Sequence, residues 1–95
     1  MLNLKSVQAK SQIIHRLARV EGQLRGVQKM IAEDRDCKDI VQQLIAIRSA
    51  VQSASLSFMQ DVTTECLANL DHQGDPEAQR VAMSDLIKML GKLSE

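Results

Sequence analysis

The residues best suited to chemistry in this sequence are its two cysteines, Cys37 and Cys66. A thiolate is a nucleophile and also a ligand for soft metal ions such as Cu(I). The two histidines, His15 and His72, form no recognisable metal-binding spacing with the cysteines. The sequence shows no nucleophile–base pair, paired-carboxylate site or phosphate-binding loop, so we do not expect an enzyme. Isolated cysteines are also common as buried, inert side chains, and this alternative stays open.

The segment between the cysteines determines whether the two thiols can meet. Residues 37–69 repeat apolar side chains at alternating spacings of four and three, and no proline or glycine lies between Cys37 and Gln73. This pattern predicts one continuous helix, in which the 29 residues from Cys37 to Cys66 span about 43 Å. A disulfide requires Cα atoms within about 7 Å, so the thiols of one chain cannot meet. An antiparallel partner helix would instead place Cys37 beside Cys66 of the partner subunit.

Cys37 is expected at the start of this helix, where the positive end of the helix dipole favours a thiolate. Arg35 and Lys38 add to this effect, whereas the neighbouring acidic residues oppose it (Asp34, Asp36 and Asp39). Asp36 is also the expected N-cap of the helix. Because the N-terminus lacks the apolar core of a signal peptide, we expect a cytoplasmic protein whose thiols are reduced.

Two more helices are expected beside this one. Residues 6–32 carry an apolar stripe at helical spacing, made by Ile13, Leu17, Val20, Leu24, Val27 and Ile31. Residues 76–93 follow an N-cap aspartate and begin with a proline. Their expected apolar face comprises Met83, Ile87 and Leu90, with Leu86 and Leu93 beside them. The sequence therefore predicts an all-α single domain, residues 1–95, with the first two helices in an antiparallel hairpin and a short C-terminal helix. Such long stripes favour a dimer of dimers over a monomeric three-helix bundle.

Composition and charge narrow the function classes. Of 95 residues, 44% are hydrophobic and Phe58 is the single aromatic residue, which excludes an all-β fold and a disordered chain. No apolar run is long enough to span a membrane. The net charge is zero, but residues 1–30 contain six basic residues and one acidic residue, so the rest of the chain carries the opposite excess. A basic N-terminal third indicates a polyanionic partner or a solvated helix face with salt bridges.

The sequence from His15 to Val27, HRLARVEGQLRGV, resembles the signature of the copper-sensing operon repressor (CsoR/RcnR/FrmR) family. The acidic turn before Cys37 and the segments 39–41 and 43–50 resemble it as well. The resemblance implies an all-α homotetramer that binds operator double-stranded DNA and releases it when an inducer binds. Arg16 matches the family's DNA-binding arginine, and we add Lys10, Arg19 and, more weakly, Arg48, as bases that neutralise phosphates.

The inducer is indicated by one departure from the family pattern. The family's copper sensors ligate Cu(I) through two cysteines, which match Cys37 and Cys66, and a histidine four residues before the second, where this chain has Val62. Two cysteines without the histidine resemble the CsoR-like sulfurtransferase repressor (CstR) branch, which implies a persulfide or polysulfide inducer and no metal or other cofactor. The alternatives are a Cu(I)-responsive repressor, with His72 as a possible third ligand, and a helical oligomer with structural cysteines.

Overall fold

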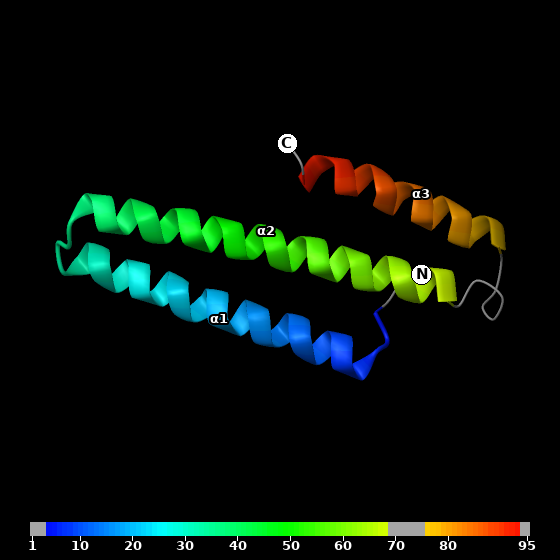
Figure 1. Ribbon diagram of the computed structural model, residues 1–95, viewed down its shortest axis with the longest axis horizontal. Helices are drawn as coiled ribbons and strands as arrows, with labels where there is room; N and C mark the ends of the chain where they lie inside the picture. The colour runs from blue at the N-terminus through cyan, green and yellow to red at the C-terminus, as the bar shows by residue number, and fades with distance from the viewer. Residues whose placement is uncertain (1–3, 69–75, 94–95) are drawn as a thin grey trace.

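Three helices make up the structure, a computed structural model that describes residues 4–68 and 76–93, except for the side chains of Cys66, Ala68 and Leu93. They are α1 (Val7–Ala32), α2 (Cys37–Ala68) and α3 (Pro76–Leu93), in this order along the chain (Figure 1). No strand occurs in the described ranges, so the expected all-α fold is confirmed. The expected end of the second helix at Asn69 and the residue His72 lie outside the described residues.

Local sequence signals set the ends of α1 and α2. Ser6 has an extended backbone, and its hydroxyl oxygen accepts a hydrogen bond of 3.2 Å from the N–H of Ala9, which caps α1. Asp34 adopts a left-handed conformation with φ of 56°, which aspartate tolerates better than most residues. Asp36 then accepts a hydrogen bond of 3.0 Å from the N–H of Lys38. This bond confirms Asp36 as the cap of α2, and the short turn makes α1 and α2 an antiparallel hairpin.

The apolar stripes of the hairpin are only half covered. In α1, Val20 and Val27 are buried against α2, where Ile47 completes the core cluster. The alternate members of the α1 stripe remain exposed, namely Leu17, Leu24 and Ile31. In α2 the buried positions include Ile47, Ala54 and Val62, and the alternate members Leu44, Val51 and Phe58 are exposed. Within the described residues, each stripe therefore has one set of buried positions and an alternate set that stays partly exposed.

Helix α3 packs on α2, which lies between the two other helices (Figure 1). The half-buried positions of α3 include Met83, Leu86 and Leu90. Ile87, which belongs to the expected apolar face, is 59% exposed in the protomer. It lies one residue beyond Leu86, about 100° around the helix, and so falls on the flank of the contact.

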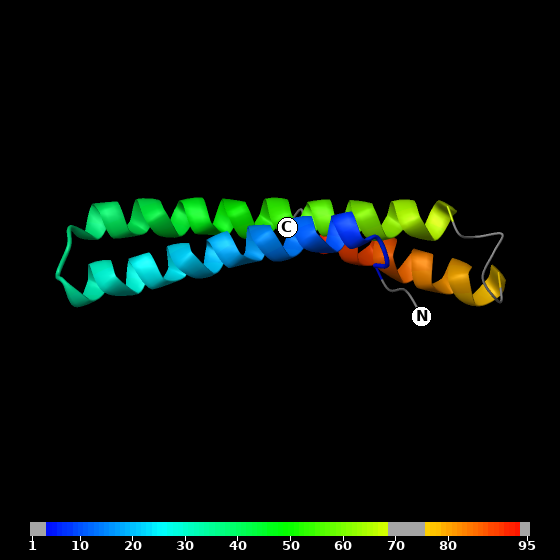
Figure 2. The same ribbon diagram turned by 90° about the horizontal axis from the view of Figure 1, so that it is seen from below.

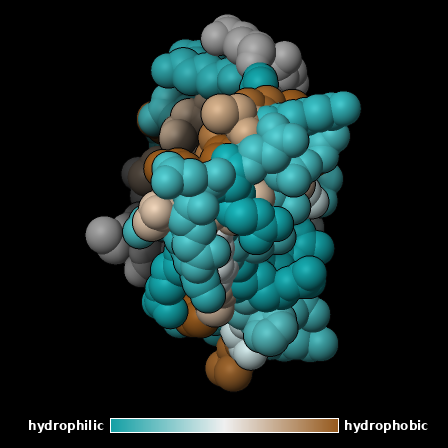
Figure 3. Space-filling view, turned by 90° about the vertical axis from the view of Figure 1, so that its left-hand side faces the viewer, coloured by the Kyte–Doolittle hydropathy of each residue, from teal (hydrophilic) through white to brown (hydrophobic). Residues whose placement is uncertain are grey.

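The protomer is long and thin, with extents of 56 × 29 × 14 Å between Cα atoms (Figure 2). At this thickness the helices enclose little, and no described side chain is fully buried. Seen from the end where α1 turns into α2, the surface is mostly hydrophilic with smaller hydrophobic areas between the polar side chains (Figure 3). None of the described helices combines the length and the hydropathy that crossing a bilayer requires.

Candidate thiol and nucleic-acid sites

The first cysteine lies at the start of the hairpin's second helix. Cys37 is the first residue of α2, directly after the capping residue Asp36, and it is exposed as a free thiol. Its exposure in the protomer is opposite to what a buried structural cysteine would show. An exposed thiol at a helix N-terminus is accessible to a small electrophile or to a soft metal ion.

The second cysteine lies at the other end of the same helix. α2 is continuous from Cys37 to Ala68, so Cys66 belongs to its last turn (Figure 1). An unbroken helix places the two residues about 43 Å apart, far beyond the reach of a disulfide. The structure therefore agrees with the sequence in keeping the two thiols of one chain apart.

The two cysteines nevertheless share one side of α2. Their separation of 29 residues is about eight full helical turns, so the two positions fall on the same face of the helix. Heptad steps from Cys37 lead to Leu44, Val51 and Phe58, which are 45%, 41% and 39% exposed. A line of partly exposed apolar side chains, called the apolar seam below, thus runs from Cys37 toward the end of α2 that carries Cys66.

Val62 lies at the position of the family's histidine ligand, and it is buried, with 7% of its surface exposed. A valine has no lone pair and cannot bind a metal ion. Within the described residues of one chain, no three His, Cys, Asp or Glu side chains are grouped closely enough to hold a metal ion. His15 is exposed on α1, in a hollow that it shares with Arg16 and Asp61.

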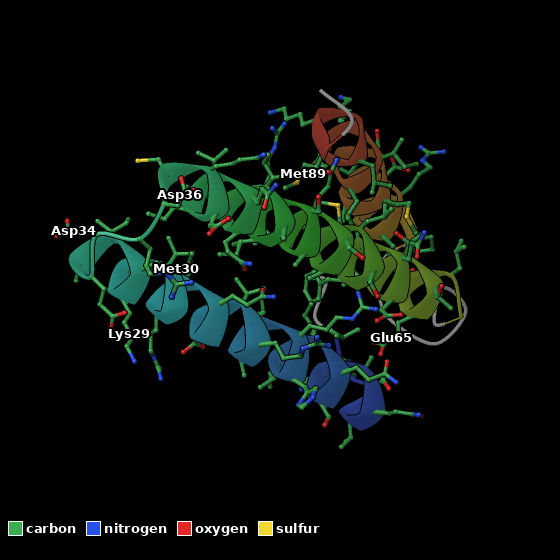
Figure 4. The ribbon with its side chains drawn as sticks, turned by 60° about the vertical axis from the view of Figure 1, so that its left-hand side comes forward. Lys29, Met30, Asp34, Asp36, Glu65 and Met89 are labelled. Carbon is green, nitrogen blue, oxygen red and sulfur yellow. The ribbon has the colours of Figure 1, made fainter. Side chains whose placement is uncertain are left out.

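Glu65, directly before Cys66, makes a contact that the sequence analysis missed. Its carboxylate accepts hydrogen bonds from the backbone N–H of Lys5 at 2.8 Å and of Ser6 at 2.7 Å. These two N–H groups, Lys5 first, lower the pKa of Glu65, and the positive charges of Lys10 and Lys5 lower it further. Figure 4 shows Glu65 at the opposite end of α2 from Asp34 and Asp36. The one available signal was that the first turn of α1 contains no acidic residue of its own.

The four candidate DNA-binding residues are all exposed, but they do not form one cluster. Arg16 and Arg19 line a groove between α1 and α2, opposite the small residues Ala50 and Ser53. Lys10 borders a different shallow hollow on α1, and Arg48 lines neither. The structure therefore brings Arg16 and Arg19 together in one groove, and Lys10 lines a separate hollow.

These arginines are also available for a partner. Within the described part of the chain, Lys10, Arg16 and Arg19 make no ion pair, whereas two other bases of α1 pair with glutamates of their own helix. Those pairs are Arg25 with Glu21 at 3.6 Å and Lys29 with Glu33 at 3.8 Å. Unpaired guanidinium groups beside small residues form a surface that a phosphate can approach.

Comparison with known proteins adds independent information. Residues 9–92 match the model of a family described as metal-sensitive transcriptional repressor. The chain is 38% identical to the copper-sensing transcriptional repressor CsoR of Bacillus subtilis (strain 168), over 99% of this chain and 90% of that protein. It is 27% identical to the transcriptional repressor RcnR of Escherichia coli (strain K12), over 90% of this chain and 91% of that protein.

Solved structures show the same architecture. The copper-sensing repressor CsoR with Cu(I) from Geobacillus thermodenitrificans NG80-2 superimposes with a TM-score of 0.78 at 29% identity, covering 100% of this chain and 95% of that one. The nickel-responsive transcriptional regulator InrS superimposes with a TM-score of 0.68 at 27% identity, covering 96% of each chain.

Proposed function

Because the chain belongs to the CsoR/RcnR family of metal-sensitive transcriptional repressors, we propose that it releases operator DNA when an inducer joins Cys37 to Cys66 of the partner subunit. The protein is then a regulator and not an enzyme. Family membership also leaves no reason to treat it as a helical oligomer without a DNA partner.

A dimer through the apolar seam supports the intersubunit site. Leu44, Val51 and Phe58 keep 45%, 41% and 39% of their surface exposed in one protomer, and a second copy could cover this remaining apolar surface. An antiparallel copy whose two-fold axis passes close to Val51 would lay seam against seam, because Val51 is the central residue of the seam. The midpoint between Cys37 and Cys66 lies within one residue of Val51, so the register that covers the seam also brings each Cys37 close to Cys66 of the partner subunit. A second pairing of such dimers gives the expected homotetramer.

Val62 is the observation that carries the choice of inducer. A buried valine at the histidine position leaves two thiols and no nitrogen ligand at that position, and two thiols are suited to sulfur chemistry. We therefore propose a persulfide or polysulfide inducer, as in the CstR branch, acting in a reducing cytoplasm.

The chemistry proceeds in two balanced steps. The Cys37 thiolate attacks the terminal sulfur of a persulfide RSSH, forms a new S–S bond and releases the thiol RSH. Cys66 of the partner subunit then attacks the Cys37 sulfur, which gives an intersubunit disulfide and releases the terminal sulfur as H₂S. The transferred sulfur atom is the oxidant, since it ends as sulfide. Polysulfides can leave additional sulfur atoms in the bridge.

Cu(I) is the second candidate inducer, and the named relatives support it better than they support reactive sulfur. Two of the comparisons above are with copper-sensing repressors, one of them solved with Cu(I). Two thiolates bind Cu(I) tightly enough for a low-coordinate site. The residues described here do not complete the three-ligand set, because Val62 cannot contribute.

The DNA-contacting surface follows from the basic residues of α1. Arg16 and Arg19 in their groove, with Lys10 nearer the start of the helix, would neutralise phosphates, and Arg48 would contribute less. Affinity for DNA should therefore fall steeply as the salt concentration rises. An assembly of four chains would multiply this basic surface.

One experiment separates the inducers. The reduced repressor, bound to a G-tract-containing duplex at low salt, is treated with sodium tetrasulfide or with Cu(I) in parallel. We expect tetrasulfide to release the DNA and to produce a covalent dimer on a non-reducing gel, which Cys66→Ala abolishes. If tetrasulfide gives no linked dimer, the sulfur proposal is wrong.

Release by Cu(I), bound at one ion per protomer in the presence of a strong chelator, would establish the copper alternative instead. Failure of the reduced protein to bind the duplex at low salt would contradict both.

A further inference from the structure

The start of the described chain is held against the far end of α2. Leu4 is buried, with 7% of its surface exposed, and the next two residues donate their N–H groups to Glu65. We call residues Leu4, Lys5 and Ser6 the N-terminal strap. Because Ser6 is the N-cap of α1, the strap ends where α1 begins. Figure 4 shows Glu65 on the side of α2 that faces the start of α1.

Glu65 supplies a negative charge that the first turn of α1 lacks. The first turn of α1 contains no acidic residue, so the positive end of its dipole is not balanced by its own sequence. The Glu65 carboxylate supplies this negative charge from a position 59 residues further along the chain. The place where α1 begins is thus fixed by a residue in the last turns of α2.

Glu65 lies between the proposed sensing residue Cys66 and the part of α1 that carries the proposed DNA-binding residues. It directly precedes Cys66 and lies one helical turn after the buried Val62. On the other side of the hydrogen bonds, the strap continues into the segment of α1 that carries Lys10 and Arg16. A movement of the last turn of α2 must therefore either move the strap or break its bonds to Glu65.

We propose that Glu65 is the positioning residue that transmits the state of Cys66 to the start of α1, a role that rests on the function proposed above. When Cys66 is bonded to Cys37 of the partner subunit, the last turn of α2 is drawn along the seam toward that subunit. The N–H groups of Lys5 and Ser6 are then left behind, because hydrogen bonds of 2.7 and 2.8 Å weaken steeply with displacement and misalignment. Without its anchor, α1 no longer holds Lys10 and Arg16 in the arrangement that DNA requires.

Glu65→Gln is the informative variant, because the amide keeps the shape of the side chain but loses the charge and one of the two acceptors. Glu77→Gln is the matched control. Glu77 is an exposed carboxylate on α3 that accepts two hydrogen bonds of 2.8 Å from Arg80 within its own helix. The two variants change the net charge equally, and only one of them changes the strap.

The test measures amide hydrogen exchange and DNA affinity on the full-length protein, reduced and with the intersubunit disulfide formed by diamide. In the wild type, bridging should speed exchange at Lys5 and Ser6 by about tenfold or more. Glu65→Gln should show this fast exchange already when reduced. It should also shrink the ratio of DNA affinities between reduced and bridged forms by about fivefold or more. Glu77→Gln should keep the wild-type ratio.

The outcomes separate this proposal from the function on which it rests. If diamide and tetrasulfide both fail to form the bridge, the intersubunit dithiol fails and the coupling fails with it. If the bridge forms and DNA is released while Lys5 and Ser6 stay protected, the coupling alone is overturned. If Glu65→Gln weakens DNA binding but leaves the ratio of affinities unchanged, Glu65 only stabilises the fold, and the proposal is overturned as well.

Discussion

The two ends of α2 each carry one cysteine, and they are built in different ways. At the Cys37 end, neighbouring residues make the structure: Asp34 turns the chain and Asp36 caps the helix, leaving the thiol exposed. At the Cys66 end, a segment from the other end of the chain is held by Glu65 and lies near the buried Val62. A locally built end can present a thiol without moving anything else. The Cys66 end of α2 contacts the start of α1, so a change at this end can be transmitted to α1.

The largest expected difference between the two ends concerns the thiols themselves. Cys37→Ala should abolish both the sulfur transfer and the release of DNA, because the first nucleophile is lost. Cys66→Ala should stop at Cys37 with a gain of sulfur mass and no linked dimer, because only the resolving thiol is missing. Mass spectrometry of the intact chain after tetrasulfide treatment distinguishes the two. Accumulation of the same persulfide on Cys66 in Cys37→Ala would reverse the assignment of the two ends.

A histidine placed at position 62 tests whether the Cys66 end binds Cu(I) weakly because it lacks this ligand. Val62→His should raise the affinity for Cu(I) by about tenfold or more, because it adds a nitrogen ligand to two thiolates. It should also destabilise the protein by about 1–3 kcal/mol, since a larger polar ring replaces a buried valine. Chelator competition measures the first effect and chemical unfolding the second. Val62→Leu, which enlarges the side chain without adding a ligand, is the control. A gain in Cu(I) affinity with leucine would contradict the explanation.

Removing the cap tests the local character of the Cys37 end. Asp36→Ala should destabilise the protein by about 1 kcal/mol, because the N–H of Lys38 loses its acceptor. Asp39→Ala removes the same charge from the first turn but no capping bond, and it should cost less. Thermal or urea unfolding compares the two variants. Exchange at Lys5 and Ser6 should stay unchanged in both, and a change there would show that the two ends are not independent.

A smaller effect is expected from pH at the Glu65 end. The pKa of Glu65 is lowered below its ordinary value of 4.5, so the folded state prefers the carboxylate. The stability that it contributes is therefore fully present above pH 4.5 and is lost as the pH falls through the lowered pKa. The melting temperatures of wild type and Glu65→Gln should differ at neutral pH and converge in acid. A constant difference across this range would show that the charge of Glu65 is not responsible.

The same contrast explains what could be predicted from the sequence. The three helices, the cap at Asp36 and the separation of the cysteines follow from spacing and neighbouring residues, which act within a few positions of the chain. The Glu65 contact joins residues 59 and 60 positions apart, and no local pattern encodes it. The apolar pattern of α3 does not tell which of its apolar residues contact α2 and which, like Ile87, stay exposed in the protomer, because this depends on the packing partner.

The unbroken course of α2 also affects how bridging would be measured. In a two-fold dimer the two Cys37–Cys66 bridges would lie at opposite ends of the paired α2 helices, about 40 Å apart, and would share no atoms. Each bridge can then form without the other, and a single one already joins the chains covalently. The fraction of linked chains on a gel would rise faster than the fraction of thiols consumed. Titrating both quantities together would show whether one bridge suffices to release the DNA or whether both are needed.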